Sequence, residues 1–176
     1  AISPDGQMLV SSKEKIVWVW SLPDGMLLKT LKGSEERITC LAISPDSHIL
    51  ASSGWRLLDT GQFWIQVWNL LDGTVRHTLK GHTEKVTCLA MSSDGQRLVS
   101  GSEDNTVRVW NVSDGQLLQT LAEWSTSLSG THQIIGHNGR LLARRMEADD
   151  TSTYLRNLWF LPDEVRLPRL EGLSIL

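Results

Sequence analysis

The hydrophobic positions of the chain fall in short runs, not at helical spacing. Runs of about four to eight residues rich in valine, isoleucine, leucine and tryptophan alternate with clusters of glycine, aspartate, asparagine, serine and proline. Between residues 85 and 122 this pattern predicts four strands, over 85–92, 96–101, 106–111 and 116–122. An Asp-Gly pair precedes the second strand and another precedes the fourth, and these residues accept the positive φ of tight hairpins. The pattern therefore predicts an all-β meander.

The same meander recurs along the chain at a nearly constant period. Tryptophans that close the third strand stand at positions 20, 68, 110 and 159, at intervals of 48, 42 and 49 residues. A turn sequence "SPDG" at 3–6 returns as "SPDS" at 44–47, as "SSDG" at 92–95 and, more weakly, as "GHNG" at 136–139. A period of about 40 to 50 residues indicates stacked supersecondary units, because one such unit cannot bury its own apolar faces.

Several strand segments are apolar on both faces, as in "LAM" at 89–91 and "VWV" at 17–19. A sheet with two apolar faces has to be covered on both sides. Radial packing of four-stranded blades meets this requirement and leaves only short edges exposed.

Residues 81–111, "GHTEKVTCLAMSSDGQRLVSGSEDNTVRVWN", resemble a WD repeat of the β-propeller family. The resemblance repeats in register and is strong over residues 1 to about 122. It continues weakly over 123–171, through "GRLLAR" and "LRNLWFLPDEVRLPRL". The closing dipeptide is "WS" or "WN" in the first three units and never "WD", which the family tolerates. The resemblance implies a β-propeller of four-stranded antiparallel blades, about four in number and part of a larger propeller.

On this basis residues 1–176 form a single repeat domain. Its expected blade units are 1–32 with an incomplete first strand, 33–80, 81–122 and a divergent unit 123–171, with 172–176 as a completing strand. The repeats resemble those of long bacterial arrays, and this implies attachment to signalling or nucleotide-switch ATPase domains.

The two ends of the chain match one another in phase. "AISPDG" at Ala1 corresponds to "AISPDS" at Ala42, and "EGLSIL" at the end corresponds to the residues that precede Ala42. We expect a segment of a longer array. The alternative is a closed ring of four blades that shares one strand between its termini.

Composition narrows the classes of partner. The formal net charge is −3 with both signs interspersed, and no apolar run approaches the roughly 18 residues of a membrane span. We therefore expect no nucleic-acid partner, no membrane association and a cytoplasmic location. Cys40 and Cys88 lie 48 residues apart in matching phrases, so we interpret them as small hydrophobic residues of the repeat and expect no metal site and no cofactor.

The resemblance also implies a buried hydrogen-bonded chain in the third unit, made of His82, Ser100, Asp104 and Trp110. The residue types suit this role, since an indole only donates, a hydroxyl donates and accepts, and a carboxylate orients an imidazole. The other units are incomplete, because the second has Ser34 where the histidine would stand and the first has "KEK" in the turn.

The same three types, histidine, serine and aspartate, form hydrolase triads, so a hydrolase or small-ligand activity on a self-closed propeller is the alternative function. Against it, the serine is expected in mid-strand, without the "GxSxG" elbow that exposes a nucleophile. We therefore predict no catalytic residues and no enzyme activity.

Partner binding is expected where the units are lengthened. From Ser100 to Trp110 is 10 residues, whereas from Ser52 to Trp68 and from Ala143 to Trp159 is 16. The added turns lie on one rim of a propeller. The candidate contact residues on this rim are Trp55, Arg56, Leu57, Phe63, Trp64, Glu103, Arg144, Arg145 and Asp149.

Clustered tryptophan, arginine and aliphatic side chains are typical of interface anchors. The alternatives are that the first added turn packs on its own blade and that the second is a solvated turn. We predict a non-catalytic scaffold that binds a protein or peptide on this rim, as part of a larger signalling or regulatory protein, and that self-associates if its arc is open.

Overall fold

The computed structural model describes residues 1–32, 37–55, 63–121, 131–137, 140–149 and 152–161, the last three ranges by their backbone only. Within these ranges all regular secondary structure is β-strand, and consecutive strands of the same sheet pair antiparallel. The predicted all-β class is therefore confirmed.

The strands form four sheets, which we number blades 1 to 4. Blade 1 contains β1 (Met8–Lys13), β2 (Ile16–Ser21) and β3 (Leu27–Lys32). Blade 2 contains β4 (Arg37–Ile43), β5 (Ile49–Trp55), β6 (Phe63–Asn69) and β7 (Val75–Lys80). Blade 3 contains β8 (Val86–Met91), β9 (Arg97–Ser102), β10 (Val107–Asn111) and β11 (Leu117–Leu121). Blade 4 contains β12 (Thr131–His137), β13 (Arg140–Asp149) and β14 (Ser152–Leu161).

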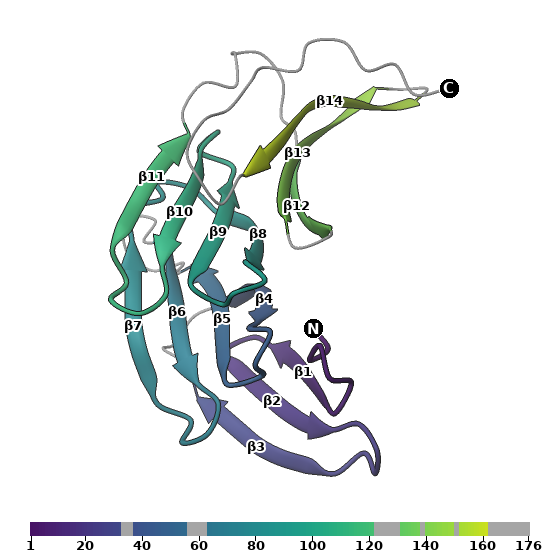
Figure 1. Cartoon of the computed structure of the whole chain (residues 1–176), viewed down its shortest axis with the longest axis vertical. Coiled ribbons are helices and arrows are strands. Elements are labelled where there is room, and N and C mark those ends of the chain that lie inside the picture. The colour runs from purple at the N-terminus through teal and green to yellow at the C-terminus, as the bar shows by residue number, and fades with distance from the viewer. Residues whose placement is uncertain (33–36, 56–62, 122–130, 138–139, 150–151, 162–176) are drawn as a thin grey trace.

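The blades fan out in an arc, as Figure 1 shows. The first strands of blades 2 to 4, which are β4, β8 and β12, lie side by side on the inner side of the arc. The strands β3, β7 and β11 lie along its outer side. This is the radial packing that the two-faced apolar strands predicted.

Blades 2 and 3 are the expected four-stranded meanders, whereas blades 1 and 4 have three strands within the described ranges. Among the described residues, blade 1 has no full strand on the inner side of β1, where the pairing is limited to a single antiparallel bridge between Ile2 and Leu9. Residues 172–176, expected as a completing strand, lie outside the described residues.

The "SPDG" turns share one hydrogen-bond pattern. In blade 2 the Ser44 hydroxyl donates to Asp46 and accepts from the Ile49 amide, and Asp46 also accepts from the His48 amide at 3.0 Å. The equivalent bonds recur at Ser3 with Asp5 and at Ser92 with Asp94. A serine and an aspartate two residues later thus build each turn, which explains why these two types are present in all three turns whereas the proline is present in only two.

The apolar core lies between blades. One cluster joins blade 1 to blade 2 and includes Val17, Leu31, Leu50 and Trp68. A second joins blade 2 to blade 3 and includes Ile65, Val67, Leu98 and Trp110. Each blade therefore buries its faces only against its neighbours, as a repeat protein requires.

The two cysteines hold equivalent places. Cys40 pairs with Ser53 in blade 2 and Cys88 pairs with Gly101 in blade 3, and neither thiol forms a disulfide. Both are half-buried, and burial raises the pKa of the Cys40 thiol.

In blade 4 the sequence prediction was wrong about the lengthened turn. Arg144, Arg145 and Asp149 lie within β13, and strand pairing continues to the pair Asp149 and Ser152. The segments "RRMEAD" and "STYLRN" contain no glycine or proline to interrupt a ladder, so the added residues lengthen the hairpin.

The register of blade 4 also differs from the alignment. Ala143 pairs with Trp159, whereas the residue opposite Trp110 is Leu98, two residues before Ser100. Ala143 therefore holds the place of Leu98 and not that of the serine, as the bulge between Ala143 and Arg145 permits.

Candidate functional site

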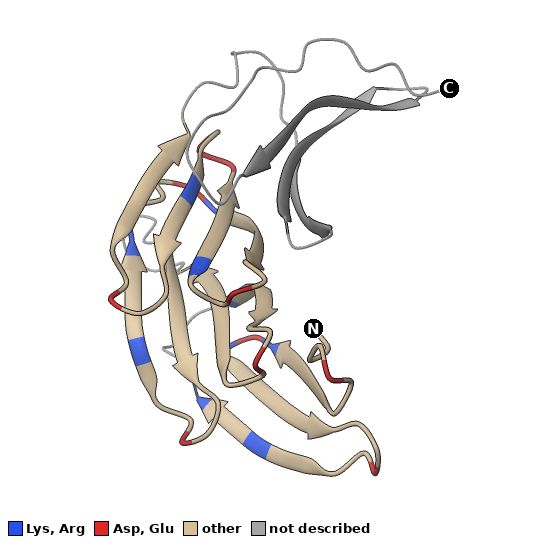
Figure 2. Cartoon of the chain, in the orientation of Figure 1, with Lys and Arg blue, Asp and Glu red and all other residues tan. Residues whose placement is uncertain are grey.

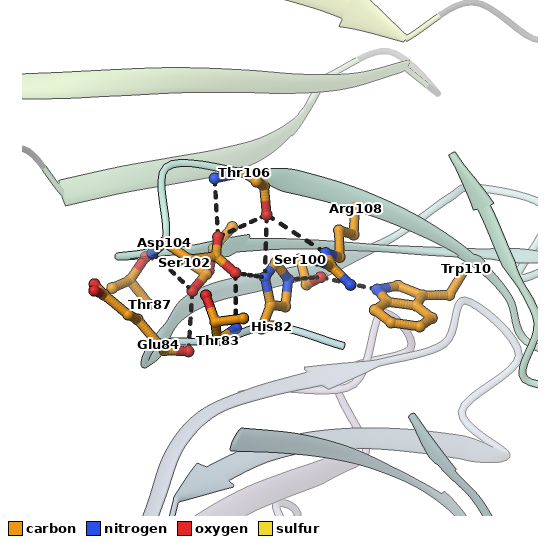
Figure 3. A network of polar contacts seen from close by, with 11 residues as sticks. His82, Thr83, Glu84, Thr87, Ser100, Ser102, Asp104, Thr106, Arg108 and Trp110 are labelled. Atoms are coloured by element: carbon orange, nitrogen blue, oxygen red, sulfur yellow. Dashed lines mark hydrogen bonds and ion pairs between the residues drawn. The ribbon is translucent and has the colours of Figure 1, made fainter. Parts of the chain in front are cut away.

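The structure brings His82, Ser100, Asp104 and Trp110 together in blade 3, as Figure 3 shows. The Trp110 indole N–H donates to Ser100 Oγ at 2.9 Å. Ser100 Oγ lies 2.7 Å from His82 Nε2, and His82 Nδ1 lies 2.8 Å from Asp104 Oδ2. When the imidazole carries its hydrogen on Nδ1, it donates that hydrogen to the Asp104 carboxylate, and Nε2 accepts from the Ser100 hydroxyl. All four groups are then satisfied in one chain of bonds.

The strands and turns place these four side chains from different parts of the blade. His82 precedes β8, Ser100 is in β9, Asp104 is in the turn after β9, and Trp110 is in β10. Ser100 pairs with Arg108 and Leu98 with Trp110, so the indole reaches the hydroxyl diagonally across the ladder.

Asp104 is the most heavily bonded member of this network. It accepts from the Thr83 amide at 3.0 Å, from the Thr106 amide at 2.9 Å and from the Thr106 hydroxyl at 2.6 Å. Burial acts to raise the pKa of Asp104. The hydrogen bonds from His82 and Thr106 outweigh it and hold that pKa well below its usual value. The carboxylate is therefore a fixed acceptor.

Sequence reasoning missed Thr106 as a member of the network. Its hydroxyl also lies 3.3 Å from His82 Nδ1. A signal was present, since Asp-X-Thr occurs again at Asp72, where the carboxylate accepts from the Thr74 amide and hydroxyl at 2.8 and 2.7 Å. At Asp72 and at Asp104 the carboxylate thus accepts from both the amide and the hydroxyl of the threonine two residues later.

The serine of this network is inaccessible. Ser100 has 0% of its surface exposed, and its oxygen already contacts both the indole and the imidazole. A substrate carbonyl has no route to that oxygen unless the blade opens. Nor do the described residues contain a cluster of three histidine, cysteine, aspartate or glutamate side chains able to hold a metal ion.

The hydrogen bond from tryptophan to serine is present in each of blades 1 to 3. The bond between histidine and aspartate is found in blade 3. Trp20 donates to Ser11 and Trp68 donates to Ser52, each at 2.8 Å. In blade 2, Trp64 holds the place of Thr106 and lies opposite Gly54, which holds the place of Ser102. An indole thus covers the part of blade 2 that corresponds to the polar network.

Trp64 was expected as an exposed contact residue, and that expectation was wrong. Only 6% of its surface is exposed, because the residue opposite is a glycine and leaves room for the ring. The alternative, in which this aromatic residue packs on its own blade, is correct for Trp64.

The remaining rim candidates are divided by the structure. Trp55 ends β5 and Phe63 begins β6, so the two pair directly, and both are half-buried. Glu103 holds the place of Trp55 in blade 3, is exposed, and lies 3.9 Å from the Lys85 ammonium. Arg56 and Leu57 lie outside the described residues, and Arg144, Arg145 and Asp149 are placed by their backbone in β13.

Comparison with known proteins agrees with this geometry. A family profile described as WD40, "WD domain, G-beta repeat", matches residues 25–69 and 72–111. These two matches fall on the segments that build blades 2 and 3 and the end of blade 1. The chain belongs to the WD-repeat family.

Solved structures share the fold of this WD-repeat chain. The structure of U3-55K superposes on 88% of the chain with a TM-score of 0.64 at 24% identity. The RRP9 WD40 repeats superpose on 88% with a TM-score of 0.65 at 24% identity. The chain covers 50% and 49% of those proteins, respectively. At this identity the likeness concerns the propeller fold.

Curated relatives of the WD-repeat chain are longer proteins. It is 40% identical over 55 residues to WD repeat and SOCS box-containing protein 1 of Xenopus tropicalis, which is 30% of this chain and 13% of that protein. It is 30% identical over 136 residues to the pre-rRNA-processing protein crb3/ipi3 of Schizosaccharomyces pombe, which is 70% of this chain and 30% of that protein. The chain therefore spans less than a third of either relative. None of its described segments is a helix long and apolar enough to cross a membrane.

Proposed function

We propose that this WD-repeat chain is a non-catalytic scaffold that holds a protein partner against its rim. One observation supports this most directly: in blade 3 the histidine, serine and aspartate are buried and bonded to one another, with Trp110 closing the chain. Histidine, serine and aspartate could catalyse hydrolysis at an accessible site, but here their hydrogen bonds connect the turn after β9 to the strands β9 and β10. Membership of a family of repeat propellers supports the same function.

The proposed contact surface is the rim at the ends of β5, β6 and β9. Trp55 and Phe63 form an aromatic pair at the edge of blade 2, and Arg37 pairs with Trp55 from the other side. Glu103 and Lys85 add an exposed pair of opposite charges in blade 3. An aromatic centre beside a polar, charged border is the usual composition of a protein interface.

Affinity capture with the double variant W55A/F63A tests the rim. The bait is the full chain, in extracts of the organism that expresses it. We expect at least one captured protein to be lost with W55A/F63A and retained with the control variant L71T/V75T, which changes exposed residues on the outer side. Equal capture by both variants would overturn the assignment of the rim, provided that their unfolding midpoints match that of the unaltered chain.

The absence of catalysis is tested separately. A fluorophosphonate probe labels activated serines, and we expect no labelling at Ser100, because its hydroxyl is buried and already bonded. Labelling that disappears in S100A would favour the hydrolase alternative.

The setting of the scaffold is also part of the proposal. We propose that the chain belongs to a larger regulatory protein in the cytoplasm. A second setting, an RNA-processing assembly, is favoured by the similarity over 136 residues to a protein named for pre-rRNA processing. Fluorescence imaging of the tagged parent protein separates the two, since nucleolar signal would contradict the cytoplasmic setting.

A further inference from the structure

The large apolar side chains that are exposed gather on the outer side of the blades. Of the nine such residues among those described, eight lie on the outer strands or on the turns that lead into them: Leu22, Met26, Leu27, Leu28, Leu71, Val75, Leu117 and Leu118. A β-bulge recurs where the outer strand begins in each of blades 1 to 3. The bulge leaves consecutive residues such as Leu27 and Leu28 opposite a single partner, which explains why both are exposed.

Polar bonds connect these exposed segments from blade to blade. The Lys29 ammonium donates to the carbonyl oxygens of Leu70 and Leu71, at 2.9 and 2.6 Å. One blade further on, His77 Nε2 lies 2.9 Å from the Ser113 carbonyl oxygen. Lys29 and His77 hold the same position in β3 and β7, so the outer surface is continuous across three blades.

Lysine side chains gather at one end of blade 1. The outer strand β3 ends in Lys32, which pairs with Ile16, and Ile16 also pairs with Lys13. Directly opposite residues point to the same face, so Lys13 and Lys32 share one face of the blade, with Lys15 in the adjoining turn. Glu14 is the one acidic residue in that turn. The turn between β2 and β3, at the other end of the blade, contains one acidic residue, Asp24, as Figure 2 shows.

β3 is also an edge strand with no neighbour on its outer side among the described residues. The bulge at Leu27 and Leu28 prevents regular pairing there, which leaves Lys29–Lys32 as the part of the edge open to another strand. We define the outer patch of blade 1 as Met26, Leu27, Leu28, this free edge and Lys32. Met26 is 62% exposed and Leu28 is 54% exposed.

We propose that the outer patch of blade 1 binds an extended segment of a protein partner that carries two apolar residues followed by acidic residues. The apolar residues contact Met26 and Leu28, the backbone pairs with the free edge of β3, and the carboxylates face Lys32 and Lys13. Leu28 and Lys32 are four residues apart, which is about 13 Å along a strand, so a partner segment that pairs parallel to β3 has its acidic residues about four positions after its apolar ones. This inference rests on the proposed scaffold function and adds a second contact surface, which follows the outer strand β3 and reaches the rim of blade 1 at Lys13.

The matched variants come from the other blades. Leu118 occupies in β11 the position of Leu28, and Lys80 occupies in β7 the position of Lys32. L118T and K80E are therefore controls for L28T and K32E. Threonine retains the strand preference while removing the large apolar side chain.

The probe is a fluorescein-labelled peptide of about ten residues, with alternating valine and threonine in its first half and glutamates about four positions on. Fluorescence polarisation with the full chain measures its affinity. We expect L28T and K32E each to weaken binding about tenfold, and L118T and K80E to leave it within about twofold. A second peptide with lysine in place of each glutamate is expected not to bind, and added salt is expected to weaken the first peptide.

The opposite results are equally specific. Failure of the first peptide to bind, or equal losses with L28T and L118T, would overturn the proposal. Concentration-dependent dimerisation that L28T abolishes would also overturn it, because the occupant would then be a second copy of this chain. None of these outcomes affects capture through Trp55 and Phe63, so failure of the outer patch is distinguishable from failure of the rim.

Discussion

The Trp64 indole lies over Gly54, the residue directly opposite it in blade 2. A Cβ atom on Gly54 would lie 2.5 Å from Trp64 Cζ2 and 2.9 Å from the Arg37 carbonyl oxygen. The bare backbone at residue 54 is therefore what admits the ring to the interior. Blade 2 replaces a polar network with a large apolar side chain at this place.

Gly54→Ala is expected to destabilise the chain by about 2 to 3 kcal/mol, because the ring and the backbone carbonyl both have to move. Urea denaturation followed by tryptophan fluorescence measures the change. Gly25→Ala is the control, since it has the conformational penalty of a positive φ of 66° but no atom within 4 Å of the new Cβ. We expect about 1 kcal/mol there, and an equal loss at both sites would contradict the packing role of Gly54.

Asp104→Ala is expected to lower the free energy of unfolding by about 2 to 4 kcal/mol. The change leaves the buried imidazole and the amides of Thr83 and Thr106 without their acceptor. The measurement is the midpoint of chemical denaturation at pH 7. The exposed Asp114, whose Oδ1 accepts only from the Gln116 amide in its own turn, is the matched control as Asp114→Ala. An unchanged midpoint in Asp104→Ala would refute the network as a source of stability.

The contribution of Asp104 is expected to depend on pH in one direction. Its pKa in the folded chain lies below the value of about 3.9 in the unfolded chain, so the carboxylate stabilises the fold above about pH 4. That contribution is lost as the pH falls toward the folded-state pKa. The difference in unfolding free energy between the unaltered chain and Asp104→Asn is therefore expected to be constant from pH 7 to 5 and to shrink toward pH 3.

Comparison with Asp104→Asn is necessary because other aspartates also titrate. Asp46 and Asp94 accept hydroxyl hydrogen bonds in their turns, and these bonds lower the pKa of each. Their effect is common to both proteins and cancels in the difference. A difference that grows as the pH falls would show that the sign is wrong.

Ser47→Gly is expected to stabilise the chain by about 0.5 to 1 kcal/mol. Ser47 has a φ of 61° where the equivalent turn positions are Gly6 and Gly95, and a residue with a Cβ is strained in that conformation. The buried Ser47 hydroxyl has no hydrogen bond of good geometry among the described residues, and its only polar interaction is with Asp5, whose pKa it lowers. Ser47→Ala separates the two causes, since it removes the hydroxyl and retains the strain. Thermal unfolding compares the three proteins, and a lower midpoint in Ser47→Gly would contradict the expected relief of strain.

Much of the fold was predictable because its signals are local or periodic. The four strands of blade 3 were expected within about two residues of their observed ends, since alternating apolar positions and Asp-Gly turns define strands and hairpins over short distances. The partners of Trp110 were implied by a resemblance, and each is a residue type with the required donor or acceptor.

Blade 4 shows where such signals fail. The residues between Ala143 and Trp159 were counted as a loop because the unit was longer than blade 3, yet length does not distinguish a longer turn from longer strands. Pairing decides the matter, and pairing of Asp149 with Ser152 involves hydrogen bonds that no single segment specifies.

The sequence by itself determined the all-β class, the repeat and the residue types of the blade 3 network, because these follow from periodicity and from side-chain chemistry. Only the tertiary structure decided that Trp64 is inside while Leu28 is outside. Both are large apolar residues on strands next to turns, and their burial depends on their surroundings. The Trp64 ring fits over Gly54, which has no side chain to exclude it. Leu28 lies in the bulge of an edge strand, which faces solvent. The burial of a side chain depends on the neighbours that folding brings to it, so the residue type alone does not predict it.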